Sequence, residues 1–165
     1  MAFDCFLKIE TIPGESTDDK HKDWIEVLSY SSGVTQSSAG SHSTSGGRTA
    51  GRADFADFMV MHTLDKASPK IALACAKGEH IKTVTIALNR AGGKKEPFME
   101  YKLEDVVISA VNIGGSSQGS ESLPTEQISF NYGKITWTYT ETDKASGAPK
   151  GKVSGGWSLI ENKAV

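Results

Sequence analysis

Residues 115–119, Gly-Ser-Ser-Gln-Gly, match the spacing G-x-S-x-G, in which a serine can act as the nucleophile of a hydrolase. That chemistry needs a sharp turn between a strand and a helix, because the turn exposes the serine hydroxyl and places backbone amides around an oxyanion. Here the polar run continues into Leu123 and Pro124 and then into a strand pattern, so no helix is expected after Ser117. The sequence therefore predicts no nucleophilic serine at this motif.

A glycine–lysine run lies at residues 92–95, Gly-Gly-Lys-Lys, and at first sight suggests a loop that binds phosphate. A P-loop has the spacing G-x-x-x-x-G-K-[ST] and leads into a helix. Neither feature is expected here, so the sequence favours a hairpin turn between two strands.

Histidine and cysteine, which could bind metal or act as nucleophiles, are spread singly along the chain. The histidines are about twenty residues apart and therefore lack the spacing of paired metal ligands. They are His21, His42, His62 and His80. Cys5 and Cys75 are interpreted as small buried hydrophobic residues. Their spacing leaves a disulfide open, although a lone pair without a secretory signal favours a reducing compartment. The sequence predicts no catalytic residue, no cofactor and no metal site, and hence a protein that is not an enzyme.

The composition narrows the class of protein further. A chain of 165 residues is expected to form a single domain over residues 1–165. The formal net charge of −2 gives no electrostatic reason to expect nucleic acid as a partner. No run of 18 apolar residues exists, so no membrane insertion is expected. Asp4, Lys8 and Glu10 interrupt the stretch that a cleaved signal peptide would need, so the usual signal is not expected to direct any export.

Alternating apolar residues predict that most of the chain forms strands. In residues 3–12, Phe3, Cys5, Leu7 and Ile9 share one face, as in a half-buried strand. Related patterns recur in residues 23–33, 54–64, 81–90, 98–113, 125–142 and 157–165. Six to eight strands with one helix predict a mainly β protein, an antiparallel β-barrel or sandwich.

The strand pattern of residues 125–142 changes parity at Gly133, which predicts a glycine bulge that bends the strand. The large residues on either side of that change are expected to fill the interior. These large residues are Phe130, Tyr132, Trp137 and Tyr139. Together with Trp157 they are enough to fill the interior of a small barrel.

A helix is predicted after Ser68, with Ser68 as its cap and Pro69 at its first position. Gly78 is expected to end it in the left-handed conformation, with Lys77 in the last turn. Apolar residues cover most of its circumference, which indicates that more than one side is covered. Either the helix closes the mouth of a barrel, or a neighbouring subunit covers its second side.

A long serine–glycine segment occupies about residues 31–52. Within residues 31–51, Arg48 is the only residue with a formal charge. Loops longer than about 15 residues without structure of their own are uncommon in compact domains. Two interpretations stay open, a flexible surface loop and a segment that becomes ordered on contact with a partner.

The motifs taken in order along the whole chain resemble the haemolysin-coregulated protein (Hcp) family, whose members form the tube of bacterial type VI secretion systems. The resemblance is sharpest at Asp65-Lys66-Ala67-Ser68-Pro69, and it continues at Arg90-Ala91-Gly92-Gly93 and Gly155-Gly156-Trp157. The opening Asp4-x-Phe6-Leu7-Lys8-Ile9 and the stretch Glu126-x-Ile128-x-Phe130 also match.

The resemblance implies a two-sheet antiparallel β-barrel with one short flanking helix, assembled into hexameric rings that stack into a tube. It further implies a spike protein at the tube tip, a contractile sheath around the tube, and effector proteins carried in the lumen. The protein would be cytoplasmic before firing and then secreted without a cleaved signal peptide. No fused toxin domain is expected after the barrel.

Two sets of contact residues follow from this implied assembly. Residues of the serine–glycine segment are expected to contact a stacked ring, namely Gly33, Gln36, Ser38, Ser41, His42, Ser43 and Arg48. On the helix, Lys70, Leu73 and Lys77 are expected at a subunit contact. The alternative function is a monomeric β-barrel that binds a small molecule, against which the large residues expected inside argue, since they leave little cavity.

Overall fold

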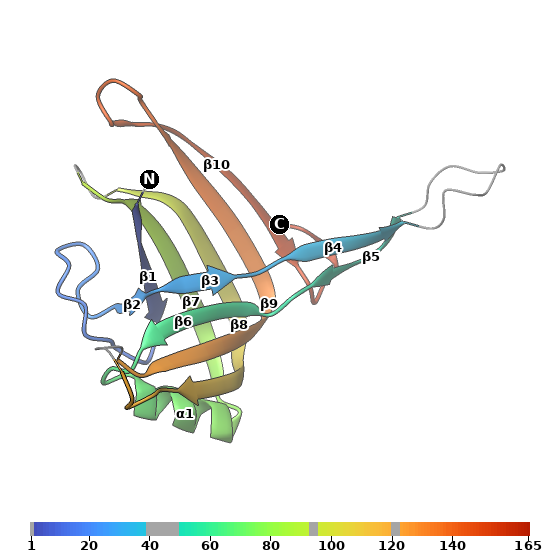
Figure 1. Ribbon diagram of the computed structural model, residues 1–165. Coiled ribbons are helices and arrows are strands. Elements are labelled where there is room, and N and C mark those ends of the chain that lie inside the picture. The colour runs from blue at the N-terminus through green and yellow to red at the C-terminus, as the bar shows by residue number, and fades with distance from the viewer. Residues whose placement is uncertain (1, 39–49, 93–95, 120–122) are drawn as a thin grey trace.

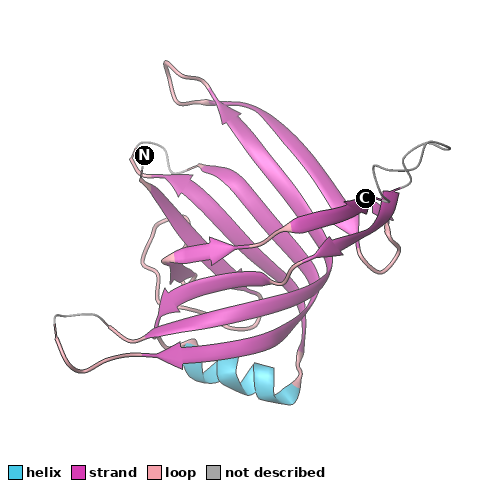
Figure 2. Ribbon diagram, turned by 45° about the vertical axis from the view of Figure 1, so that its right-hand side comes forward, coloured by secondary structure: helices cyan, strands magenta, loops and turns pink. Residues whose placement is uncertain are grey.

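The computed structural model describes residues 2–38, 50–92, 96–119 and 123–165. Within these residues the chain is mainly β, with antiparallel strands and one short helix, which confirms the predicted class. The strands are β1 (Phe3–Ile9), β2 (Ile25–Val27), β3 (Ser29–Ser31), β4 (Val34–Ser38), β5 (Ala50–Phe55), β6 (Phe58–Thr63), β7 (His80–Arg90), β8 (Pro97–Gly114), β9 (Thr125–Thr142), β10 (Pro149–Ser158) and β11 (Lys163–Ala164). The helix α1 (Ser68–Lys77) follows β6 and lies across one end of the strands (Figures 1 and 2).

The larger sheet has the strand order β11-β10-β9-β8-β7-β1-β2, and β9 also pairs with β6. The long strand β9 changes partner along its length. Residues 125–130 pair with β6, whereas residues 134–142 pair with β10. The other edge of β9 pairs with β8 from Thr125 to Tyr139. Because one strand serves two partners, its two halves belong to two layers (Figure 1).

The chain at residues 25–31 connects those layers on the opposite side. β2 pairs with β1, and β3 pairs with β6. Between them, the Leu28 amide donates to the Met61 carbonyl oxygen at 2.8 Å. The short run therefore forms hydrogen bonds to β1 with its first half and to β6 with its second.

The bend in β9 lies at the predicted residue, but its cause is different. The register between β8 and β9 is unbroken across Gly133, so the bulge predicted there is wrong. Asp105, on β8, has a φ of 56°, and a Cβ on Gly133 would lie 2.7 Å from the Asp105 carboxylate. Close approach at the corner thus requires the glycine. The register shift lies instead in β8, between Ile108 and Ala110.

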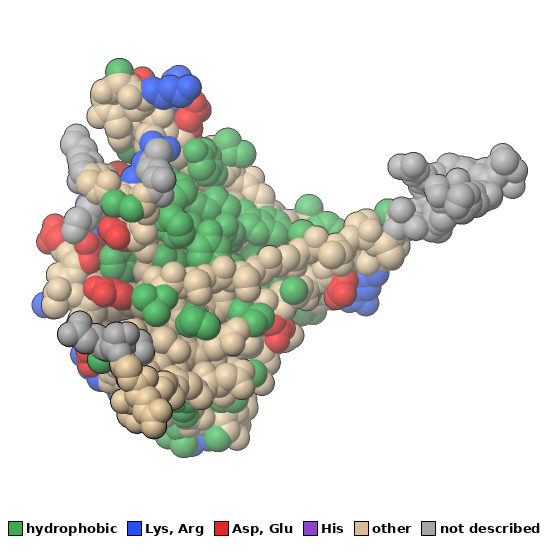
Figure 3. Space-filling model, in the orientation of Figure 1, with side chains coloured by type: hydrophobic (Ala, Val, Ile, Leu, Met, Phe, Trp, Pro, Cys, Tyr) green, Lys and Arg blue, Asp and Glu red, His purple; other side chains and the backbone are tan. Residues whose placement is uncertain are grey.

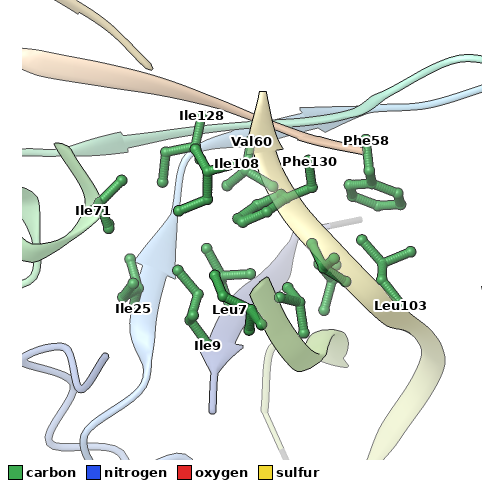
Figure 4. Packing of buried hydrophobic residues seen from close by; sticks show 14 of the residues in the cluster. Leu7, Ile9, Ile25, Phe58, Val60, Ile71, Leu103, Ile108, Ile128 and Phe130 are labelled. Atoms are coloured by element: carbon green, nitrogen blue, oxygen red, sulfur yellow. The ribbon is translucent and has the colours of Figure 1, made fainter. Parts of the chain in front are cut away.

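The core lies between the two layers and under α1. Figure 4 shows Ile71 of α1 on the same side of the cluster as Ile25 and Ile128, while Phe58, Phe130 and Leu103 pack farther from the helix. All six of these side chains are fully buried. In β1 the alternation places Cys5, Leu7 and Ile9 in this cluster, as expected, whereas Phe3 is 48% exposed.

Helix α1 ends as predicted and begins differently. Gly78 has a φ of 63°, and its amide donates to the Cys75 carbonyl oxygen at 3.1 Å. At the other end the cap residue is Ala67, because the Ser68 hydroxyl accepts from the Asp65 amide at 3.1 Å instead of capping the helix. Among the described residues, no helix has the length and apolar character needed to cross a membrane.

The serine–glycine segment is not a loop throughout. Its described ends form the antiparallel hairpin β4–β5, with Val34 opposite Phe55 and Gln36 opposite Ala53. This hairpin projects away from the rest of the strands (Figure 1). The sequence missed it because serine, glycine and alanine provide no alternation of apolar and polar residues.

The large residues of β9 and β10 do not all fill the interior: Trp137 and Trp157 pack against the core in part, and the prediction is wrong for Tyr139. Phe130 and Tyr132 are buried, but Trp137 and Trp157 are half-buried and Tyr139 is 41% exposed. The two cysteines are free thiols, so the disulfide left open by their spacing is not formed. Burial raises the pKa of the Cys5 thiol to about 12.

Candidate functional site

An apolar surface covers the inner side of the sheet where β8, β9 and β10 extend beyond the core. The register places Met99 opposite Tyr139, Tyr101 opposite Trp137 and Leu103 opposite Ile135, so the three pairs share one face. Leu103 and Ile135 are buried, whereas Tyr101 and Trp137 are half-buried and Tyr139 is exposed. The concave apolar face is defined here as Met99, Tyr101, Trp137, Tyr139 and Val153.

The space-filling view shows a broad hydrophobic area on this hollowed side, bordered below by the chain that leads into β4 (Figure 3). Val153, opposite Tyr139, is 72% exposed and carries the area onto β10. Soluble monomers rarely expose large contiguous apolar areas, and such areas usually mark interaction sites.

An aromatic pocket of about 140 Å³ lies where this face meets the base of the hairpin. Five aromatic rings line it, one each from β3, β5, β6, β8 and β9, and they are Tyr30, Phe55, Phe58, Tyr101 and Trp137. Ring centroids lie 5.3 Å apart for Phe58 and Tyr101 and 6.3 Å apart for Phe55 and Trp137. Burial, followed by the hydrogen bond to Tyr101, raises the pKa of Tyr30 to about 12, so that hydroxyl stays neutral. The pocket is therefore an uncharged aromatic recess.

Polar contacts hold the base of the hairpin against the strands. Asp57, in the turn between β5 and β6, accepts from the Ser109 hydroxyl at 2.7 Å and from the Asn131 amide at 3.1 Å. The Tyr132 hydroxyl donates to the Ala56 carbonyl oxygen at 3.0 Å. Ser109 lies at the register shift of β8, so that irregularity directs a side chain at Asp57.

The hairpin itself extends beyond these contacts. Gly33 and Gln36 are exposed, and Ser38 ends β4. The other residues expected to contact a stacked ring, Ser41, His42, Ser43 and Arg48, lie outside the described residues. On β5, the Arg52 guanidinium donates to the Leu159 carbonyl oxygen at 3.3 Å, which places β5 beside the C-terminal turn.

The second expected set lies elsewhere on the molecule. Lys70, Leu73 and Lys77 are exposed on α1, and Leu73 is 52% exposed. Ile71 and Ala74 face the core, so α1 has one buried side and one side that is exposed among the described residues. The helix and the projecting hairpin lie at separate places (Figure 1), so the structure does not bring the two sets together.

Ser117 lies in the turn after β8, and the described chain that follows enters β9 without a helix. A buried pair, His62 and Glu126, has its Nε2 and Oε2 atoms 2.8 Å apart with both side chains fully buried. His21 is stacked on Phe6 at a centroid distance of 4.4 Å and contacts Asp18 at 3.0 Å. His21, His62 and Glu126 are therefore buried parts of the fold, whereas Ser117 is exposed.

Sequence reasoning missed Tyr30, Phe55, Tyr101 and Trp137 as a shared surface. The two-residue alternation of Met99, Tyr101 and Leu103 was a usable signal for one face of β8. The alternation could not show that other strands bury Leu103 but leave Tyr101 half-buried, because that burial depends on how β3 and β6 cross the sheet.

Comparisons with known proteins agree on one family. The family described as "Type VI secretion system effector, Hcp" matches residues 6–139. Protein hcp1 of Pseudomonas aeruginosa is 35% identical over 164 residues, which is 98% of each chain. The solved structure of a type six secretion system protein has a TM-score of 0.93 at 37% identity and covers 99% of this chain and 100% of its own. Hcp1 from Salmonella typhimurium has a TM-score of 0.80 at 29% identity, with 99% and 100% covered. The chain therefore belongs to the Hcp family of type VI secretion system proteins.

Proposed function

We propose that this chain is the tube subunit of a type VI secretion system and that it acts as a structural protein, not as an enzyme. Six copies form a closed ring, and rings stack into a tube that is expelled. The spike protein caps the tube, the contractile sheath surrounds it, and effector proteins travel in its lumen. The subunit resides in the cytoplasm until expulsion and is then secreted.

The concave apolar face is the observation that carries this proposal. It continues the core rows of β8 and β9 outward, yet nothing within the described residues covers Tyr139 or Val153, which are 41% and 72% exposed. Copies of the same chain that cover one another in a closed ring would bury this area once per subunit.

The subunit is proposed to be one domain whose two layers close into a barrel. Residues 25–31 support closure, because they form hydrogen bonds to β1 on one side and to β6 on the other. The aromatic pocket does not favour the alternative of a small-molecule carrier. Its volume of about 140 Å³ is below the roughly 300 Å³ at which ligand pockets usually begin.

Size-exclusion chromatography with light scattering tests the ring. The expected mass is about six times the chain mass of 17.6 kDa, and electron microscopy at higher concentration should show stacked rings. A chain that stays monomeric at every concentration from micromolar to millimolar would overturn the proposal.

A further inference from the structure

A buried polar pair, His62 and Glu126, interrupts the apolar side chains between β6 and β9. The other inward-facing pairs of these strands are apolar, and they are Phe58 with Phe130 and Val60 with Ile128. All six side chains are at most 1% exposed. His62 Nε2 lies 2.8 Å from Glu126 Oε2, whereas His62 Nδ1 and Glu126 Oε1 have no hydrogen-bond partner among the described residues. Each of the two side chains therefore depends on the other.

The apolar residues of β6 do not select one register on β9. Residues 58–61, Phe-Met-Val-Met, are apolar without a break, so they show no alternation that would distinguish the two faces. Side chains alternate with a period of two, and a shift of two residues would keep Phe58 and Val60 facing inward. Val60 would then lie opposite Phe130, or Phe58 opposite Ile128, depending on the direction of the shift. Apolar packing therefore permits more than one pairing of these strands.

The polar pair is satisfied in one register. A shift of two residues would place His62 opposite Ile128, or Val60 opposite Glu126, and would separate the pair. A shift of one residue would turn His62 outward and leave Glu126 buried without its partner. A buried polar group or charge without a partner is strongly unfavourable, because it has lost its water. The shifted registers are therefore penalised by these two residues.

Polar contacts also hold the start of β6, but they lie at the surface. Asp57 accepts from the Ser109 hydroxyl and from the Asn131 amide, and both hydrogen bonds are exposed. Water can replace a partner that is lost from an exposed hydrogen bond, so the loss is less costly than at a buried one. The choice of register therefore depends more on His62 and Glu126.

We propose that His62 and Glu126 are positioning residues that select the register of β6 on β9. The hairpin β4–β5 leads into β6, and β6 leads into α1 (Figure 1). A strand rises about 3.4 Å per residue, so a shift of two residues would move both neighbouring segments by about 7 Å along β9. The pair thus determines where the hairpin projects and where α1 meets the core. This role is separate from the proposed function, since both strands belong to one chain.

Methyl NMR of the methionines reads the register, because Met59 and Met61 lie on β6 while Met99, on β8, is an internal reference. The double variant His62→Leu with Glu126→Leu removes the polar pair. Its midpoint of urea unfolding should equal or exceed that of the unmodified chain, since apolar residues often replace a buried ion pair without loss of stability. Met59 and Met61 should nevertheless give two peaks each, and Met99 should give one.

Two rearranged variants with the amino-acid composition of the unmodified chain are the matched controls. His62→Glu with Glu126→His exchanges the partners, so Met59 and Met61 should give single peaks. Val60→His with His62→Val moves the histidine by two residues along β6, so that it can meet Glu126 only after a shift of two residues. The peaks of Met59 and Met61 should then move away from their positions in the exchanged variant, while Met99 stays in place.

Single peaks for Met59 and Met61 in the apolar variant would overturn the proposal at any stability, because the pair would then leave the register unaffected. Peaks of the relocated variant at the positions of the exchanged variant would overturn it as well, and this comparison decides the matter if the apolar variant does not fold. Paired peaks in the apolar variant and moved peaks in the relocated one would support it. The peaks arise from strands within one chain, so monomers and rings give the same answer.

Discussion

The strands β8 and β9 run from a closed region of the molecule to an open one, and the two regions differ in cover and not in sequence pattern. Leu103 and Ile135 face each other and are at most 1% exposed. One pair farther along, Tyr101 and Trp137 are half-buried, and in the next pair Tyr139 is 41% exposed. Apolar alternation therefore indicates which face of the sheet a residue lies on, but the strands that cross that face determine whether the residue is buried.

This difference predicts that mutations in the closed region act on the folding of the chain, while mutations in the open region act on assembly. The four tests below are arranged by their expected effect on the free energy of unfolding. That quantity should be measured at concentrations where light scattering finds monomers, since assembly itself adds apparent stability.

The largest effect is expected for Phe130→Ala in the closed region. Phe130 is fully buried, so the change removes a large side chain and leaves a cavity, with a loss of about 3–5 kcal/mol. Urea unfolding measures this. Trp137→Ala is the matched change in the open region and should cost clearly less, and an equal loss would erase the distinction between the regions.

An intermediate effect is expected for Gly133→Ala at the corner. The new Cβ would lie 2.7 Å from the Asp105 carboxylate and 2.9 Å from Ile160 Cδ1, so neighbouring atoms must move. Strain of this kind typically costs about 1–3 kcal/mol. Gly155→Ala is the control on the neighbouring strand, where a Cβ meets nothing within 4 Å. Equal midpoints of thermal unfolding for the two variants would contradict the argument.

A small effect on folding and a complete effect on assembly are expected for Tyr139→Lys. The side chain is 41% exposed, so folding should change by less than about 1 kcal/mol, but the new charge would lie in the covered face of a ring. Light scattering should find monomers. Thr138→Lys places the same charge on the other face of β9, opposite Glu100, and should leave rings unchanged. Rings from Tyr139→Lys would show that the concave apolar face is not a subunit contact.

The smallest effect is expected for Ser117→Ala. The residue lies exposed in the turn between β8 and β9, where a substitution usually changes stability within about 0.5 kcal/mol. Ring mass and export should be unchanged. Lost export from intact rings would mean that the G-x-S-x-G motif has a role that the fold does not suggest.

The same contrast explains how far the sequence could lead. Strong local signals gave correct results, such as the alternation in β1 and the left-handed stop at Gly78. The hairpin β4–β5 was missed because its strands are polar and are defined by pairing alone. At Gly133 the sequence located the bend but not its origin, because the Asp105 conformation belongs to the opposite strand. Trp137 and Tyr139 were placed inside because composition counts large residues and cannot show where the interior ends.

The burial of Cys5 has a consequence for a secreted protein. A cysteine is oxidised or attacks a disulfide mainly as the thiolate, and burial raises the pKa of this thiol to about 12. At neutral pH almost no thiolate exists, and the side chain is only 6% exposed. In the proposed function, expulsion moves the subunit from the reducing cytoplasm to surroundings where thiols are readily oxidised. Cys5 should stay an unreacted thiol through that change, so β1 keeps the same chemistry before and after expulsion.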